Sequence, residues 1–186
     1  MVPLLFTCFF ILLFTYHHRN LHISSVILFW SQFPVSKDNE RIWEKLESAS
    51  GKITNGARYI NRTVIKLYQK TELSDEDFHL IEGYCDKSRL DQTREADAIV
   101  LDELHKSGRY QKVFQHLTIN LPFASEVGRC SIVLRPVCSE DVMTARFAKL
   151  PYELVGIIAR KIAALPYVDA IFFDLTNKPP ATFGWE

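Results

Sequence analysis

The chain of 186 residues predicts an α+β fold with a small mixed β-sheet and helices packed on one of its faces. Segments 131–137 and 168–175 are short runs rich in β-branched and aromatic residues, as expected of buried strands. Residues 151–164 lie between them, repeat apolar side chains at helical spacing and begin with Pro151. Strand, helix and strand in this order predict a βαβ unit with parallel strands and a right-handed crossover.

The elements before this unit start with a helix and a strand. Residues 41–50 place Ile42, Trp43 and Leu46 at helical spacing, and Gly51 can end that helix. The β-branched residues of segment 57–68 predict a strand.

Two more helices and a further strand are predicted before the βαβ unit. Segment 73–84 opens with Ser74 followed three positions later by Asp77, a pattern close to a capping box, so a short helix is expected. Segment 89–106 carries an apolar stripe and is followed by Gly108 at the position of a C-cap. Segment 113–121 favours a strand.

Composition excludes several classes of function. Twenty-two basic and 22 acidic residues cancel, so no net field attracts nucleic acid. The four cysteines lack the C-x-x-C spacing of zinc sites, and their pattern favours a reduced intracellular setting. No two of the 7 glycines lie closer than five residues, so the sequence has no phosphate-cradling loop for ATP or a dinucleotide. No metal site and no catalytic residue is predicted.

Residues 1–33 form an apolar leader, 34–70 a linker with a partial helix and strand, and 71–186 the main domain. The uncharged run 2–16 is shorter than the roughly 20 residues of a spanning helix. It is either a membrane anchor or the product of a misassigned gene start, and we expect a cytoplasmic protein.

The C-terminal segment is the most informative motif. This segment contains Asp174, Thr176, Lys178, Pro179, Pro180, Thr182, Trp185 and Glu186. At these positions it resembles the C-terminus of glutamine-hydrolysing GMP synthetases. The family's Arg-Glu-Ala-Asp, Leu-Arg-x-Val, Met-Thr-Ala and Leu-Pro-Tyr motifs are similar to segments beginning at Arg94, Leu134, Met143 and Leu150. The resemblance is strong from about residue 88 to 186, faint over 41–68 and absent before residue 41.

The resemblance implies a dimerisation domain that also binds the nucleotide XMP. In the whole enzyme, ATP (with Mg²⁺) adenylates the xanthine 2-oxygen, and ammonia released from glutamine displaces AMP to give GMP. The amidotransferase and ATP-pyrophosphatase domains of that family have no counterpart in this sequence, so they would lie in a separate or upstream polypeptide. The expected partners are therefore XMP and a second copy of the chain. The alternative is a non-catalytic association module that has lost XMP binding.

The resemblance also implies the residues that face XMP, which are Lys178, Pro180, Thr182, Phe183 and Glu186, with weaker support for Arg135 and Glu95. A lysine is a compact charge suited to a phosphate, and the Pro-Pro pair fixes the backbone after it. Gly184 stands where the family usually has Glu, and loss of that charged hydrogen bond costs about 1.5–3 kcal/mol. Arg135 either contacts phosphate or pairs with Glu140 or Asp141, and Arg94 and Glu95 form an alternative surface ion pair.

Overall fold

The structure, a computed structural model, describes residues 9–10, 16–18, 21–23, 26–29, 39–56 and 60–185. Its helices are α1 (Asn39–Gly56), α2 (Lys87–Lys106) and α3 (Tyr152–Ala163). The longer strands are β5 (Arg62–Gln69), β7 (Gln115–Leu121), β9 (Cys130–Cys138) and β11 (Val168–Asp174). The short ones are β1 (Phe9–Phe10), β2 (Tyr16–His18), β3 (Leu21–Ile23), β4 (Val26–Phe29), β6 (His79–Leu80), β8 (Phe123–Ala124) and β10 (Arg146–Phe147).

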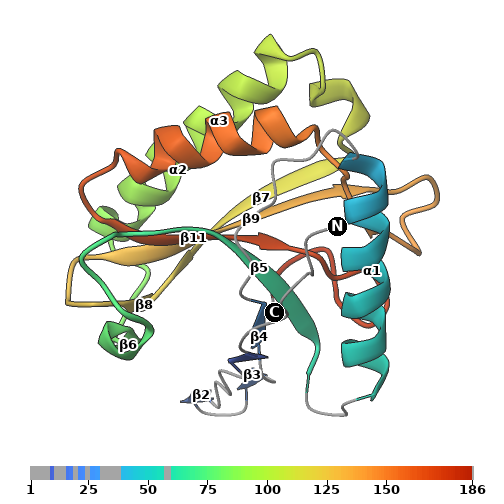
Figure 1. Cartoon of the computed structure of the whole chain (residues 1–186). Helices are drawn as coiled ribbons and strands as arrows, with labels where there is room; N and C mark the ends of the chain where they lie inside the picture. Colours follow the sequence, from blue (N-terminus) through green and yellow to red (C-terminus); the bar gives the residue numbers. More distant parts are fainter. Residues whose placement is uncertain are drawn as a thin grey trace, which may run out of the picture.

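A mixed sheet forms the centre of the molecule (Figure 1). β9 pairs in parallel with β11 and antiparallel with β7 and β10. β11 pairs antiparallel with β5, whose other neighbour is the parallel strand β4. β1 extends the sheet beyond β4, while β2 with β3 and β6 with β8 form separate two-stranded pairs.

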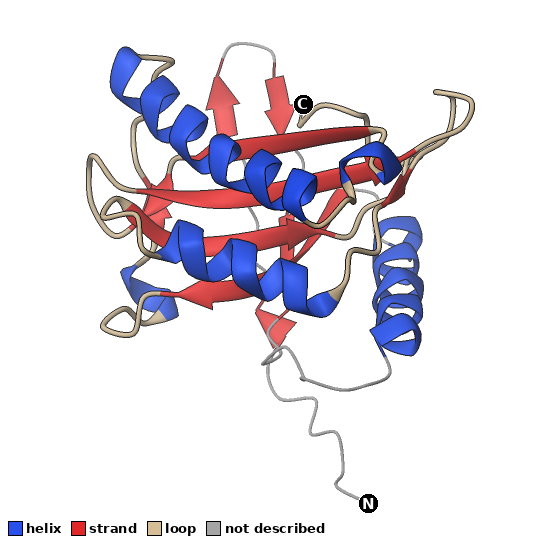
Figure 2. Cartoon of the chain, turned by 90° about the horizontal axis from the view of Figure 1, so that it is seen from above, coloured by secondary structure: helices blue, strands red, loops and turns tan. Residues whose placement is uncertain are grey.

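The two faces of the sheet bury different side chains because successive strand residues point to opposite sides. Ile65, Ile132 and Ile171 lie in the larger core cluster with residues of α1, α2 and α3. Val133 and Phe172, one position further along their strands, lie in a smaller cluster on the opposite face. Figure 2 shows α2 and α3 running side by side over the strands.

The predicted βαβ unit is confirmed. β9, α3 and β11 follow the predicted order, and β9 and β11 are parallel neighbours. Pro151 stands at the N-cap position of α3, and Glu153 supplies a negative charge in its first turn. α2 also agrees with its prediction, and Gly108 after its end has a φ of 66°, a left-handed conformation that glycine adopts without strain.

The prediction that Gly51 ends the first helix is wrong. α1 continues to Gly56, because one glycine inside a helix costs only about 1 kcal/mol and contacts on both sides of it compensate. The buried Trp43 donates its indole N–H to the Leu150 carbonyl at 3.0 Å. Next to the glycine, the Ser50 hydroxyl hydrogen-bonds the Thr63 hydroxyl of β5, and beyond it Thr54 is buried.

The helix predicted over residues 73–84 is also wrong. The capping interaction exists, since the Asp77 carboxylate accepts hydrogen bonds from the Ser74 backbone N–H and hydroxyl. It closes only a single 3₁₀ turn, Asp75–Asp77, after which the chain extends into β6. The extended backbone lets Phe78 pack against the smaller core cluster and pairs β6 with β8.

Residues 57–59 of the predicted strand 57–68 lie outside the described residues, and β5 begins at Arg62. Most of the leader segment 2–16 also lies outside them. In the described part of the chain, no helix has both the length and the apolar character needed to cross a membrane.

Candidate functional site

The C-terminal segment after β11, residues 175–185, begins at Leu175 in the larger core cluster and ends at Trp185 against the smaller cluster on the opposite face of the sheet. In Figure 1 the chain ends below the sheet, away from α2 and α3. Leu175, Thr176 and Ala181 are buried. The backbone of Lys178 exchanges two hydrogen bonds with Ala145, at 2.8 and 3.1 Å. At its end, the Trp185 side chain packs against the smaller core cluster. The segment is therefore part of the folded domain.

A buried charge cluster lies beneath this segment. Arg135 on β9, Arg62 at the start of β5 and Asp174 at the end of β11 have exposed fractions of 0%, 3% and 0%. Both guanidinium groups donate to Oδ2 of Asp174, so one carboxylate is shared by two cations. We call these three residues the arginine cluster. The strand pairing β5–β11–β9 is what brings them together.

The arginine cluster holds the backbone of the C-terminal segment. Arg135 donates to the carbonyls of Thr176 at 3.2 Å, Phe183 at 3.1 Å and Thr182 at 2.5 Å. Arg62 donates to the Thr182 hydroxyl at 3.1 Å and to the Gly184 carbonyl. Its guanidinium carbon also lies 4.8 Å from the centre of the Trp185 ring, a cation–π geometry.

Lys178 lies at the surface above this cluster. Its ammonium donates to the Val142 carbonyl at 2.8 Å and lies 4.1 Å from the centre of the Phe183 ring. The neighbouring turn is ordered by Asp141, whose carboxylate accepts hydrogen bonds from the backbone and hydroxyl of Thr144 and from the backbone of Met143. These bonds, the Thr144 N–H first, lower the pKa of Asp141. A cation is thus held at a fixed position on the surface.

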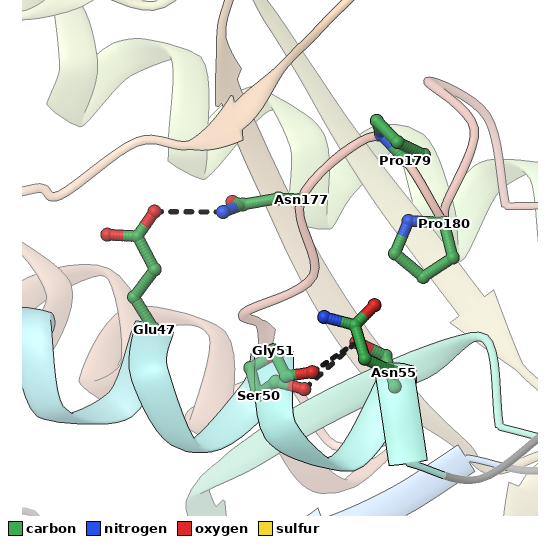
Figure 3. A pocket seen from close by; sticks show the side chains of 8 residues that line it. Glu47, Ser50, Gly51, Asn55, Asn177, Pro179 and Pro180 are labelled. Atoms are coloured by element: carbon green, nitrogen blue, oxygen red, sulfur yellow. Dashed lines mark hydrogen bonds between the residues drawn. The ribbon is translucent and has the colours of Figure 1, made fainter.

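A small pocket of about 130 Å³ opens beside Lys178, between α1 and the 177–180 turn (Figure 3). Glu47 lies at one side of it and accepts a hydrogen bond from the Asn177 amide at 2.8 Å and from Lys149 at 2.9 Å. Burial alone would raise the pKa of Glu47, but these two bonds together lower it below its ordinary value. The pocket is lined by Glu47, Ser50, Gly51, Thr54, Asn55, Asn177, Pro179 and Pro180.

The predicted site residues do not all lie together. One continuous segment contains Lys178, Pro180, Thr182 and Phe183, whereas Glu186 lies outside the described residues. Glu95 is remote from them, because it accepts a hydrogen bond from Tyr167, which precedes β11, whereas Lys178 follows that strand. A strand of this length separates the two by about 20 Å.

Arg135 is buried rather than exposed, and its ion pair is with Asp174 rather than with Glu140 or Asp141. The alternative surface pair of Arg94 with Glu95 is also absent from the described residues, where Arg94 pairs with Asp91.

Sequence reasoning missed Arg62 and the role of Asp174. The sequence did contain a signal for both residues. Arg62 and Asp174 are charged residues at the end of an apolar strand, and Arg135 is a charged residue within such a strand. Opposite charges in strands predicted to be buried must pair with each other. In the part of the chain that the structure describes, no three His, Cys, Asp or Glu side chains gather as metal ligands.

The fold and the site together define a small α+β domain whose C-terminal segment is fixed by buried arginines and presents a lysine at its surface. Residues 102–185 match the family model described as the GMP synthase C terminal domain. These residues therefore belong to the GMP synthase C-terminal domain family, as the sequence motifs predicted.

Curated relatives are similar to longer stretches of the chain. A probable glutamine-hydrolyzing GMP synthase of Leptospira interrogans is 35% identical over 152 residues, covering 82% of this chain and 25% of the relative. The GMP synthases of Symbiobacterium thermophilum and Carboxydothermus hydrogenoformans are 39% and 42% identical over 113 residues, which is 56% of this chain and 22% of each relative. The chain thus spans about a quarter of the length of the relatives it matches.

Proposed function

We propose that this chain is the XMP-binding and dimerisation part of a glutamine-hydrolysing GMP synthase that acts in the cytoplasm. The observation that carries the proposal is the fixed surface position of Lys178 in a C-terminal segment anchored by the arginine cluster. Membership of the GMP synthase family supports the assignment of this segment to nucleotide binding. ATP, Mg²⁺ and the ammonia source would be used by the other domains of the enzyme.

Lys178 would bind the phosphate of XMP. An ammonium has three donor hydrogens, and among the described residues the Val142 carbonyl accepts one of them, which leaves two for phosphate oxygens. The Phe183 ring beside the ammonium and the bonds between Lys178 and Ala145 hold the charge before the ligand arrives. Binding would therefore cost little ordering of the protein at this point.

Gly184 is the position that decides between the two candidate functions. Its carbonyl accepts the hydrogen bond from Arg62, a role that any residue fills, but it has no side chain to receive the hydrogen bonds that a glutamate would accept. This departure favours the second candidate, a non-catalytic association module that keeps a dimer surface without binding XMP.

Calorimetry of the full chain with XMP tests the first candidate. We expect binding in the micromolar range, with Lys178→Met weaker by about tenfold or more and Gly184→Glu tighter by about tenfold or more, since a charged hydrogen bond contributes about 1.5–3 kcal/mol. Glu95→Gln, remote from the segment, is the matched control and should leave the affinity unchanged. Absence of a binding heat at millimolar XMP would remove the ligand assignment.

Light scattering separates the second candidate from the first. A dimer whose mass and stability do not respond to XMP supports the association module. A monomer at every concentration contradicts the dimerisation role in both candidates.

A further inference from the structure

The burial of the arginine cluster bears on how the C-terminal segment is held. Two guanidinium groups face one carboxylate, and all three side chains are almost fully buried. Asp174 accepts one more hydrogen bond, from the Thr176 backbone N–H at 2.8 Å. Buried guanidinium groups need hydrogen-bond or aromatic partners beside their carboxylate, because a buried charge without such partners is very costly.

The C-terminal segment supplies those partners. The carbonyls of Thr182, Phe183 and Gly184 accept hydrogen bonds from the two guanidinium groups, and the Trp185 ring lies over that of Arg62. Hydrogen bonds from charged donors are roughly twice as strong as neutral ones. The segment is thus attracted to the sheet by the cluster itself.

The two arginines divide this task. Arg135 lies inside β9 and bonds Asp174 and the Thr176 carbonyl as well as the carbonyls of Thr182 and Phe183, so it also supports the end of β11. Arg62 reaches furthest along the segment, to the Thr182 hydroxyl, the Gly184 carbonyl and the Trp185 ring. Its partners are the residues nearest the position where the family usually carries a glutamate.

We infer that Arg62 is a positioning residue that fixes residues 182–185 before nucleotide binding, so that Thr182 and position 184 are held in the geometry that XMP would meet. The fixing of the segment stands by itself, and only its consequence for XMP depends on the proposed function. Arg62 acts through the segment and need not touch the nucleotide.

Arg62→Lys tests the inference in the full chain. A lysine keeps the charge beside Asp174 but cannot bond the carboxylate, the Thr182 hydroxyl and the Gly184 carbonyl together, nor stack as a guanidinium plane. Thr182→Val is a second variant, which removes only the hydroxyl that Arg62 contacts and spares the buried ion pair. It keeps the inference testable if Arg62→Lys does not fold.

The matched control is Arg129→Lys. Arg129 pairs with the buried Asp169 at the other end of the same strand, β11, and bonds the carbonyls of Pro166 and Val168 rather than the C-terminal segment. It therefore reports the general effect of weakening an arginine–aspartate pair on this strand.

The first readout is the backbone order parameter of residues 183–185 by NMR without nucleotide. We expect about 0.85 in the parent chain and in Arg129→Lys, and a fall below about 0.6 in Arg62→Lys, with a smaller fall in Thr182→Val. Values below about 0.6 in the parent chain, or unchanged values in Arg62→Lys, would overturn the inference.

The second readout is XMP affinity, expected to weaken by about tenfold in Arg62→Lys and to be unchanged in Arg129→Lys. If the order parameters change as expected and no variant binds XMP, the positioning role stands and the proposed function fails. If XMP binds the parent chain and Arg62→Lys equally well while the segment loosens, the positioning role for the nucleotide is wrong and the proposed function stands.

Discussion

Removal of Arg135 should be one of the most destabilising single changes in this domain. In Arg135→Met a side chain of similar length loses its charge, and Asp174 retains, among the described residues, Arg62 and the Thr176 N–H. The carbonyls of Thr176, Thr182 and Phe183 lose their charged donor. Breaking a buried ion pair costs about 3–5 kcal/mol, which is a large part of the 5–15 kcal/mol that stabilises a typical domain.

Denaturant unfolding followed by circular dichroism measures this loss as a lower midpoint at unchanged slope, together with a fall in melting temperature of roughly 6–20 °C. Arg94→Met is the control, because Arg94 is 68% exposed in its pair with Asp91 and should contribute less than about 1 kcal/mol. A loss below about 1 kcal/mol for Arg135→Met would refute the argument that the arginine cluster holds the sheet and the C-terminal segment together.

Further predictions concern titration and backbone conformation. Burial lowers the pKa of His116 from its ordinary 6.5 to about 4, although Asp97 opposes the shift. Between these values the unfolded chain binds more protons than the folded chain, so the free energy of unfolding should fall by about 3 kcal/mol as the pH drops from 6.5 to 4. His116→Gln should lose this component when urea unfolding is measured across that pH range. An unchanged dependence of the free energy of unfolding on pH in His116→Gln would contradict the prediction. Gly51→Ala should raise stability by about 0.5–1 kcal/mol in thermal unfolding, since Gly51 lies inside α1 and a Cβ added there meets nothing within 4 Å. Gly108→Ala should lower it by about 1 kcal/mol, because φ is 66° there, and equal effects of the two alanines would refute this reading of α1 and the α2 C-cap.

Local signals were sufficient to predict the elements whose side chains repeat regularly. The helix after Pro151 has Leu154, Ile158 and Ile162 on one face, and all three are buried in the larger core cluster as that spacing predicts. That helix connects two strands of one sheet, and a crossover of this kind joins parallel strands. The parallel pairing of β9 and β11 could therefore be predicted from the connection alone.

Other features depended on contacts that no local pattern encodes. The capping interaction of Ser74 with Asp77 is present, yet whether the chain then continues as a helix is decided by Phe78 and by the pairing of β6 with β8, more than 40 residues away in the sequence. Likewise, α1 continues past Gly51, where Ser50 hydrogen-bonds Thr63 of β5 and Thr54 is buried. In both cases long-range contacts override a weak local preference.

The candidate site was predicted in part. The motif placed Lys178, Thr182 and Phe183 in one segment, and the structure adds the arginine cluster that holds this segment. Arg62 and Asp174 are separated by 112 positions, so their pairing follows only from the strand order β5–β11–β9. The burial of Arg135 could be inferred from its apolar strand, but its partner could not.

The most direct test of the account is an NMR titration of the full chain with XMP, mapped residue by residue. The account predicts that the largest shifts fall on residues 177–185 and on the adjoining turn 142–145, with Glu95 and Tyr167 unaffected. Shifts confined to the region of Glu95, or no shift at millimolar XMP, would contradict the claim that the anchored C-terminal segment is the nucleotide site.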